Sequence, residues 1–164
     1  MRLKNPLRDM RTIKMLLDGA EAEANRAGES VPGAEHLLLA ALDLPDGTAR
    51  RAFEQVGAEP STLRQAIEEQ HAEALRAVGI DADAGAEGAV SVAPRTTGVY
   101  RSSGSAQSVF QAAGKLARES RSQLVGAHVV LAIADMEHGT AIRAVRSLGI
   151  DPEALAAAAR EEVG

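Results

Sequence analysis

The residues best placed to do chemistry form a short run, Gly33-Ala34-Glu35-His36, directly before an apolar stretch. A carboxylate beside an imidazole could serve acid–base catalysis or metal binding. Successive residues on a helix point about 100° apart, so Glu35 and His36 would not form a catalytic dyad. In the first turn of a helix, Glu35 would interact favourably with the helix dipole and the exposed N–H groups. We therefore expect either a capping residue or a ligand contact here.

The histidines give no metal-binding motif. His36 and His128 each follow the start of a predicted helix, where a neutral histidine usually packs or caps. His71 and His138 have no cysteine partner and no carboxylate at metal-ligand spacing. The chain has no cysteine, which excludes disulfides and thiolate metal sites. We expect neither a bound metal nor a cofactor.

The sequence lacks two common enzyme motifs. A Walker A loop needs Ser or Thr after Gly-Lys, but Gly114-Lys115 is followed by Leu116. The run Ser102-Ser103-Gly104-Ser105 is not the Gly-x-Ser-x-Gly elbow of serine hydrolases, and it is typical of a loop and N-cap. We therefore predict a protein that is not an enzyme.

Composition favours an all-α protein. The chain has 164 residues, of which 45% are hydrophobic and only 2% are aromatic. An aliphatic core rich in alanine favours closely packed helices over a β-sandwich. The net charge of −5, with no basic stretch interleaved with aromatics, argues against a nucleic-acid partner. No apolar run approaches the length of a membrane span, so we expect no membrane partner and a cytoplasmic location.

An internal repeat organises the chain. The segment from Asp43 to Gly57 matches the segment from Asp135 to Gly149, and Gly47-Thr48-Ala49 recurs as Gly139-Thr140-Ala141. Apolar residues spaced three and four apart, between Gly and Pro punctuation, predict four helices in each repeat. The expected ranges are 10–27, 33–43, 47–56 and 60–78, followed by 104–121, 126–136, 139–148 and 152–162.

These helices are expected to form a single domain over residues 1–164, with repeat one at about 9–79 and repeat two at about 103–163. Similar amphipathic repeats bury similar faces, so we expect them to pack around a pseudo-two-fold axis. Gly57 and Gly149 occupy positions that follow a helix and need positive φ. The stretch 80–102 is rich in small and polar residues without periodicity, which predicts a flexible linker.

The run Gly33-Ala34-Glu35-His36-Leu37-Leu38-Leu39 resembles the Gly-Thr-Glu-His-Ile-Leu-Leu signature of the Clp repeat, the N-terminal domain of Clp-family AAA+ unfoldases. The resemblance extends to both repeats and implies a stand-alone or excised domain without ATPase modules. It implies a binding module of the Clp protease system that recognises substrates, adaptors or arginine-phosphorylated proteins. The alternative is a decoy that captures peptide ligands, such as cyclic peptide antibiotics, directed at the N-terminal domain of a Clp unfoldase.

The same resemblance implies candidate ligand-binding residues. In some family members the corresponding glutamate of each repeat receives the guanidinium of phosphoarginine, while a hydroxyl and backbone amides near the first helix receive the phosphate. Glu35 matches this glutamate, and Met10 and Arg11 lie near the matching first helix, with Met10 about where the family has Thr. Ser103 offers a hydroxyl in repeat two. Because Gly126-Ala127-His128 lacks the glutamate, we expect at most one phosphoarginine site.

Overall fold

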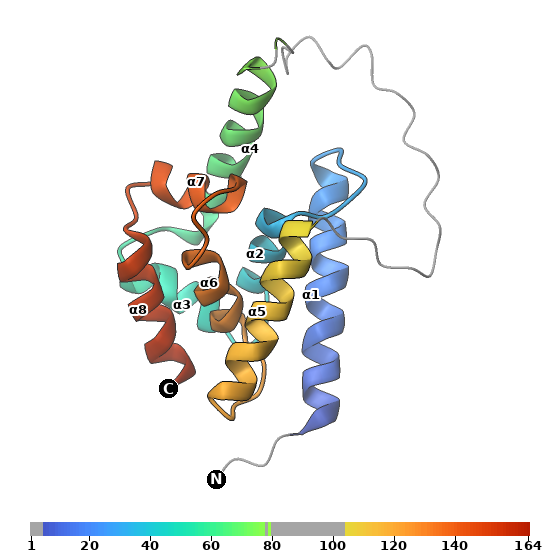
Figure 1. Ribbon diagram of the computed structural model, residues 1–164, viewed down its shortest axis with the longest axis vertical. Coiled ribbons are helices and arrows are strands. Elements are labelled where there is room, and N and C mark those ends of the chain that lie inside the picture. The colour runs from blue at the N-terminus through green and yellow to red at the C-terminus, as the bar shows by residue number, and fades with distance from the viewer. Residues whose placement is uncertain (1–4, 78, 80–103) are drawn as a thin grey trace.

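The computed structural model describes residues 5–77, 79 and 104–164, and these residues form helices and connecting loops without a β-strand. The all-α prediction is therefore confirmed. The predicted linker at 80–102 lies outside the described residues, as does Ser103. The helices in Figure 1 are α1 (Pro6–Arg26), α2 (Ala34–Leu42), α3 (Thr48–Gln55), α4 (Pro60–Ala77), α5 (Gly104–Glu119), α6 (Gly126–Ala134), α7 (Thr140–Ser147) and α8 (Pro152–Val163).

The helix ends follow local capping signals. α1 begins at Pro6 rather than at residue 10, because the Asn5 side chain accepts a 3.1 Å hydrogen bond from the Leu7 N–H and proline suits the first helical turn. Gly57 and Gly149 both have φ of 76°, which confirms the predicted positive φ after α3 and α7. All the other helix ends lie within two residues of the predicted ranges.

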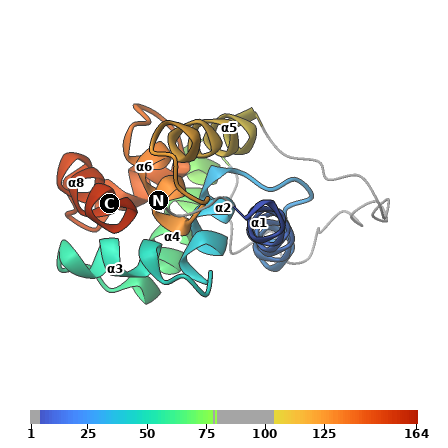
Figure 2. The same ribbon diagram turned by 90° about the horizontal axis from the view of Figure 1, so that it is seen from below.

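α2 and α6 form the centre of the protein. Every residue of α2 is buried, and so is every residue of α6 except the last. A helix that is apolar on all sides must be surrounded by other helices, which explains why these two runs lack a polar face. Figure 2 shows α2 and α6 in the interior, with α1 and α8 at opposite edges. No helix in the described part of the chain is long and apolar enough to cross a membrane.

The two halves exchange helix partners. α1 packs on α2 as α5 packs on α6, and α3 packs on α8 while α4 packs on α7. Replacing each helix with its counterpart in the other repeat turns the α3–α8 pair into the α7–α4 pair, as a two-fold axis requires. The predicted pseudo-two-fold arrangement is confirmed. An exposed ion pair at 2.8 Å between Arg51 of α3 and Glu162 of α8 also joins the halves.

His36 and His128 are buried at equivalent positions and cap their own helices. Nδ1 of His36 accepts the Gly33 N–H at 2.9 Å, and Nδ1 of His128 accepts the Val125 N–H at 3.1 Å. These bonds confirm the capping interpretation. Burial lowers the pKa of His128, although the hydrogen bond from Val125 acts in the opposite direction. The neutral ring is therefore the form that the fold favours.

This buried histidine should make the protein less stable in acid. The pKa of His128 is lower in the folded chain than its unfolded value of about 6.5. The contribution of neutral His128 to the free energy of unfolding should be complete above that pH. It should be lost as the pH falls below about 6.5 toward the lower pKa of the folded state, because the unfolded chain takes up the proton more readily. We expect urea unfolding between pH 8 and pH 5 to show this loss. In His128→Gln the free energy of unfolding should change less with pH over this range. An unchanged pH dependence would contradict the role given to His128.

Candidate functional site

A polar pocket of about 270 Å³ lies where the starts of α2, α5 and α7 meet. In Figure 1 the first turn of α5 lies beside the loop that leads into α2. Its charged and hydroxyl-bearing lining residues are Glu29, Glu35, Ser105, Thr140 and Arg143. The first turns of helices carry partial positive charge, so this pocket combines three helix starts with the carboxylates of Glu29 and Glu35.

Glu35 is buried at the start of α2, and its carboxylate folds back over Gly33. A Cβ atom at position 33 would lie 2.6 and 2.7 Å from the two carboxylate oxygens, so a larger residue there would displace the Glu35 carboxylate. Burial acts to raise the pKa of Glu35, but the neighbouring His71 imidazole, the Glu35 backbone N–H and His36 outweigh it and hold the pKa below its ordinary value. Glu35 is therefore a buried carboxylate that stays ionised at neutral pH.

The second repeat completes the pocket. The Ala34 N–H at the start of α2 donates a 3.3 Å hydrogen bond to Oγ of Ser105 on α5. Thr140 and Arg143 reach the same pocket from α7. The pocket thus presents two carboxylates, Glu29 and Glu35, from repeat one and hydroxyl groups with a guanidinium from repeat two. Such a site can accept a ligand that carries both a cationic and an anionic group.

The equivalent helix start in the other half differs. The Leu124 N–H donates to Asp9 at 3.0 Å, the Gly126 N–H to Asp46 at 3.2 Å, and the Ala127 N–H to Thr48 at 2.8 Å. These amides at the start of α6 already have acceptors from repeat one. Ala127 also stands where repeat one has a carboxylate, so the two pseudo-equivalent positions are chemically different.

The structure separates the residues that the sequence grouped. Glu35 lies in the polar pocket, but Met10 and Arg11 lie on the first half of α1 and do not line it. Arg11 instead lines a different pocket of about 480 Å³, together with Asp46 and Val125. The reason is that the first turn of α2 lies beside the first turn of α5, whereas the first half of α1 lies beside the loop that leads into α6.

Sequence reasoning missed the partners of Glu35. Nε2 of His71 lies 3.3 Å from Oε1 of Glu35, and Nδ1 of His71 lies 3.1 Å from Oε1 of Glu29. His71 comes from α4, far along the chain, and Arg143 comes from the other repeat. No local motif signals these neighbours. The paired repeat segments indicated only that α3 and α7 begin in similar ways.

Comparison with known proteins finds a matching family model and similar proteins. The family model of the Clp repeat (R) N-terminal domain matches residues 11–96. The chaperone protein ClpC2, chloroplastic, of Oryza sativa subsp. japonica is 36% identical over 75 residues, which is 46% of this chain and 8% of that protein. The chaperone protein ClpC, chloroplastic, of Pisum sativum is 36% identical over 70 residues, 43% of this chain and 7% of that protein. The chain thus spans less than a tenth of the length of these relatives.

The fold also has a solved counterpart. The crystal structure of the N-terminal domain of the caseinolytic protease associated chaperone ClpD from Arabidopsis thaliana matches with a TM-score of 0.59 at 22% identity. The match covers 96% of this chain and 95% of that chain. At this level of identity the likeness concerns the fold alone.

Proposed function

This chain belongs to the Clp repeat N-terminal domain family, and we propose that it is a non-enzymatic module that recognises substrates or adaptors of a Clp system through the polar pocket at the start of α2. The family supplies the binding role, while the ligand and the partner are our proposal. A cytoplasmic location remains a prediction, since the plant relatives are named as chloroplastic.

The observation that carries the proposal is a buried, ionised Glu35 that shares its pocket with hydroxyl groups and a guanidinium from repeat two. A guanidinium would form charge-assisted hydrogen bonds with this carboxylate. An anionic group attached to that guanidinium would lie toward Arg143 and the positive starts of α5 and α7. Phosphoarginine combines both charges in one side chain, so we propose arginine-phosphorylated protein segments as the ligand class.

We expect phosphoarginine to bind at one site per chain, because only repeat one offers the carboxylate. Glu35→Ala should weaken binding by about 1–3 kcal/mol, or about 5- to 150-fold, through loss of a charged hydrogen-bond acceptor. Titration calorimetry measures both the stoichiometry and the loss. Glu68→Ala provides a matched control, because Glu68 is exposed on α4 and does not line the pocket.

Two equivalent sites, or undiminished affinity in Glu35→Ala, would contradict this single-site proposal. Circular dichroism should show the same helical content in both variants, because neither substitution removes an apolar core residue. If phosphoarginine does not bind at all, recognition must use another surface of the domain.

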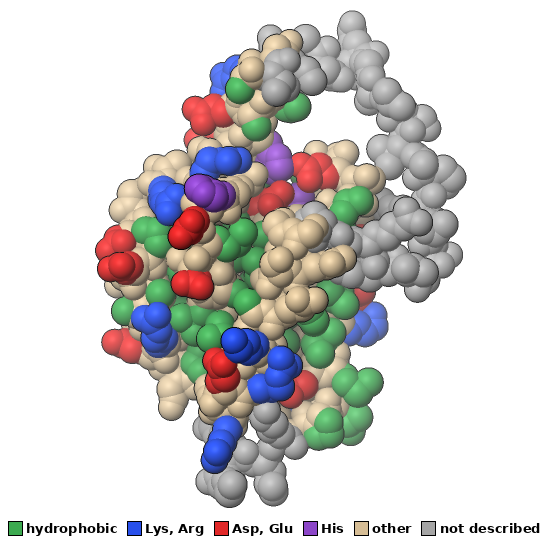
Figure 3. Space-filling model, in the orientation of Figure 1, with side chains coloured by type: hydrophobic (Ala, Val, Ile, Leu, Met, Phe, Trp, Pro, Cys, Tyr) green, Lys and Arg blue, Asp and Glu red, His purple; other side chains and the backbone are tan. Residues whose placement is uncertain are grey.

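One such surface supports the decoy alternative. Leu7 and Met10 on α1 are 73% and 65% exposed. Figure 3 shows hydrophobic side chains gathered over the beginning of α1, at the lower right. An apolar cyclic peptide could bind there. A decoy should bind the same peptide as the N-terminal domain of a Clp unfoldase, whereas an adaptor should bind the unfoldase itself, and a pull-down with each candidate distinguishes them.

A further inference from the structure

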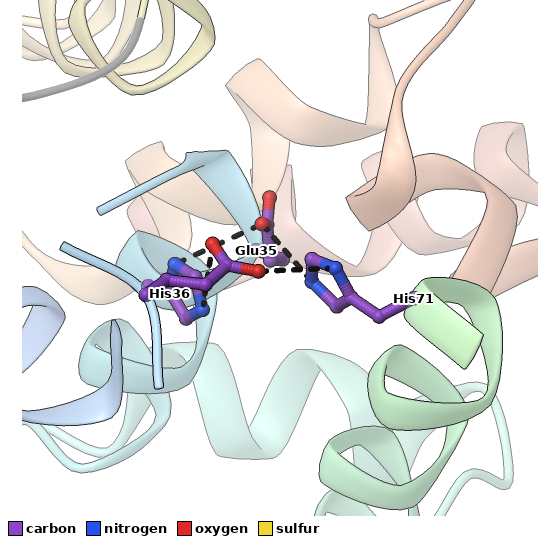
Figure 4. A group of neighbouring side chains, drawn as sticks. Glu35, His36 and His71 are labelled. Carbon is purple, nitrogen blue, oxygen red and sulfur yellow. Dashed lines mark ion pairs between the residues drawn. The ribbon is translucent and has the colours of Figure 1, made fainter. Parts of the chain in front are cut away.

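Glu35 is one of four side chains from three segments that converge. Glu29 lies in the loop after α1, Glu35 and His36 lie on α2, and His71 lies on α4. One nitrogen or oxygen atom from each lies within 4.8 Å of the others. Figure 4 shows Glu35, His36 and His71 pointing toward one another. Two carboxylates and imidazole nitrogens at such distances form a donor set suited to a divalent transition metal.

The cluster is compact enough to enclose one ion. His71 faces Glu29 through Nδ1, at 3.1 Å, and Glu35 through Nε2, at 3.3 Å, so only one of its two nitrogens can bind a given ion. One donor atom from each side chain lies within 4.8 Å of the others, whereas neighbouring donors around tetrahedral zinc, with bonds of about 2.0–2.1 Å, lie about 3.3 Å apart. The side chains would therefore have to draw together around an ion.

His36 supplies an independent observation. Its Nδ1 accepts the Gly33 N–H, so Nε2 carries the proton of the neutral ring. This Nε2 is buried, has no hydrogen-bond partner among the described residues, and lies 3.9 Å from Oε2 of Glu29. A buried N–H without an acceptor costs free energy. A shift of the Glu29 carboxylate toward Nε2 would give this N–H an acceptor.

We propose that Glu29, Glu35 and His71 bind one zinc ion, and that His36 donates its Nε2–H to Glu29 and so orients that carboxylate. Hydrogen bonds to metal-ligating carboxylates are a usual feature of such sites. The two carboxylates neutralise the charge of a divalent ion. Zinc suits mixed imidazole and carboxylate ligands, whereas calcium prefers six or more oxygen ligands and magnesium usually keeps several waters.

The metal would also change the pocket. Glu29 and Glu35 both line the polar pocket, so a zinc ion held by them would leave a coordination position facing it. An ion there would take Glu35 away from a guanidinium. Zinc should therefore compete with a cationic ligand, a consequence that rests on the proposed function. Zinc binding itself does not depend on that function.

The test is calorimetric titration of zinc chloride into the full chain after treatment with EDTA and removal of the chelator. We expect one ion per chain, and a loss of affinity of more than about tenfold in Glu29→Gln and in His71→Ala. His138→Ala should bind like the unchanged protein, because His138 is exposed and outside the cluster. Circular dichroism establishes that each variant is folded.

The absence of a stoichiometric site would overturn the metal proposal, as would affinity that survives both cluster variants or falls equally in His138→Ala. A second measurement needs no variant: zinc should raise the midpoint of thermal unfolding of the unchanged protein, and an equal concentration of magnesium should not. Zinc stoichiometry decides the metal site, while phosphoarginine binding to the metal-free protein decides the proposed function, so the two can fail separately.

Discussion

Phe53→Ala is expected to lower the free energy of unfolding by about 3–5 kcal/mol, the usual cost of removing a buried aromatic side chain. Phe53 on α3 is 0% exposed and is among the largest fully buried side chains. Its buried neighbours along the helix, Ala49 and Ala52, have no flexible atoms that could fill the space. Because α3 packs against α6 and α8, the cavity should also weaken the contact between the repeats. Urea unfolding measures the loss.

Phe110 provides a matched control, since the chain has only two phenylalanines and Phe110 on α5 is only partly buried. Phe110→Ala should cost clearly less, because water already reaches part of the ring and less apolar area is lost. An equal loss in the free energy of unfolding for the two substitutions would contradict the deeper burial assigned to Phe53.

Gly126→Leu is expected to cost about 3 kcal/mol, at the upper end of the range for overpacking. Gly126 begins α6, where it faces α2 and α3. A Cβ atom there would lie 2.9 Å from the Ala41 carbonyl oxygen and 2.9 Å from the Cβ of Ala49. Since one obstacle is backbone, the central helices themselves would have to move apart. Thermal and urea unfolding should both show the effect.

Gly114→Ala should act in the opposite direction. This glycine lies in the middle of α5, and the nearest atom to an added Cβ is Nη1 of the flexible Arg118 side chain, at 3.5 Å. Alanine restricts the unfolded chain without a clash and should stabilise the protein by about 0.5–1 kcal/mol. If Gly126→Leu proved as harmless as Gly114→Ala, the close approach of the central helices would be wrong.

The helices could be predicted from the sequence because their signals are local. Gly57 and Gly149 mark the ends of α3 and α7, and Pro60 and Pro152 begin the helices that follow. The exception was the start of α1. There the Asn5 cap and Pro6 extend the helix beyond the run of regularly spaced apolar residues. Apolar spacing is a weaker signal where the end of a helix is exposed.

The candidate site could be predicted only in part. Glu35 was identified because its position in the apolar run and the resemblance to a family both point to it. Its neighbours Ser105, His71 and Arg143 come from three other helices. Which helix start meets which depends on how the repeats pack, and a single sequence gives no direct measure of long-range contacts. Met10 and Arg11 do not line the pocket of Glu35, and a ligand-binding role for them stays a prediction.

The exchange of partners between the halves also constrains how the chain folds. α3 contacts α8 and α4 contacts α7, so much of each half is covered by residues distant in sequence. Such a topology raises the contact order, the average separation in sequence between residues in contact. The chain must lose the conformational entropy of closing long loops before these contacts can form. A separate half would leave its inner face open to water and prone to association. We therefore expect a single cooperative folding transition, in which neither half is a stable intermediate.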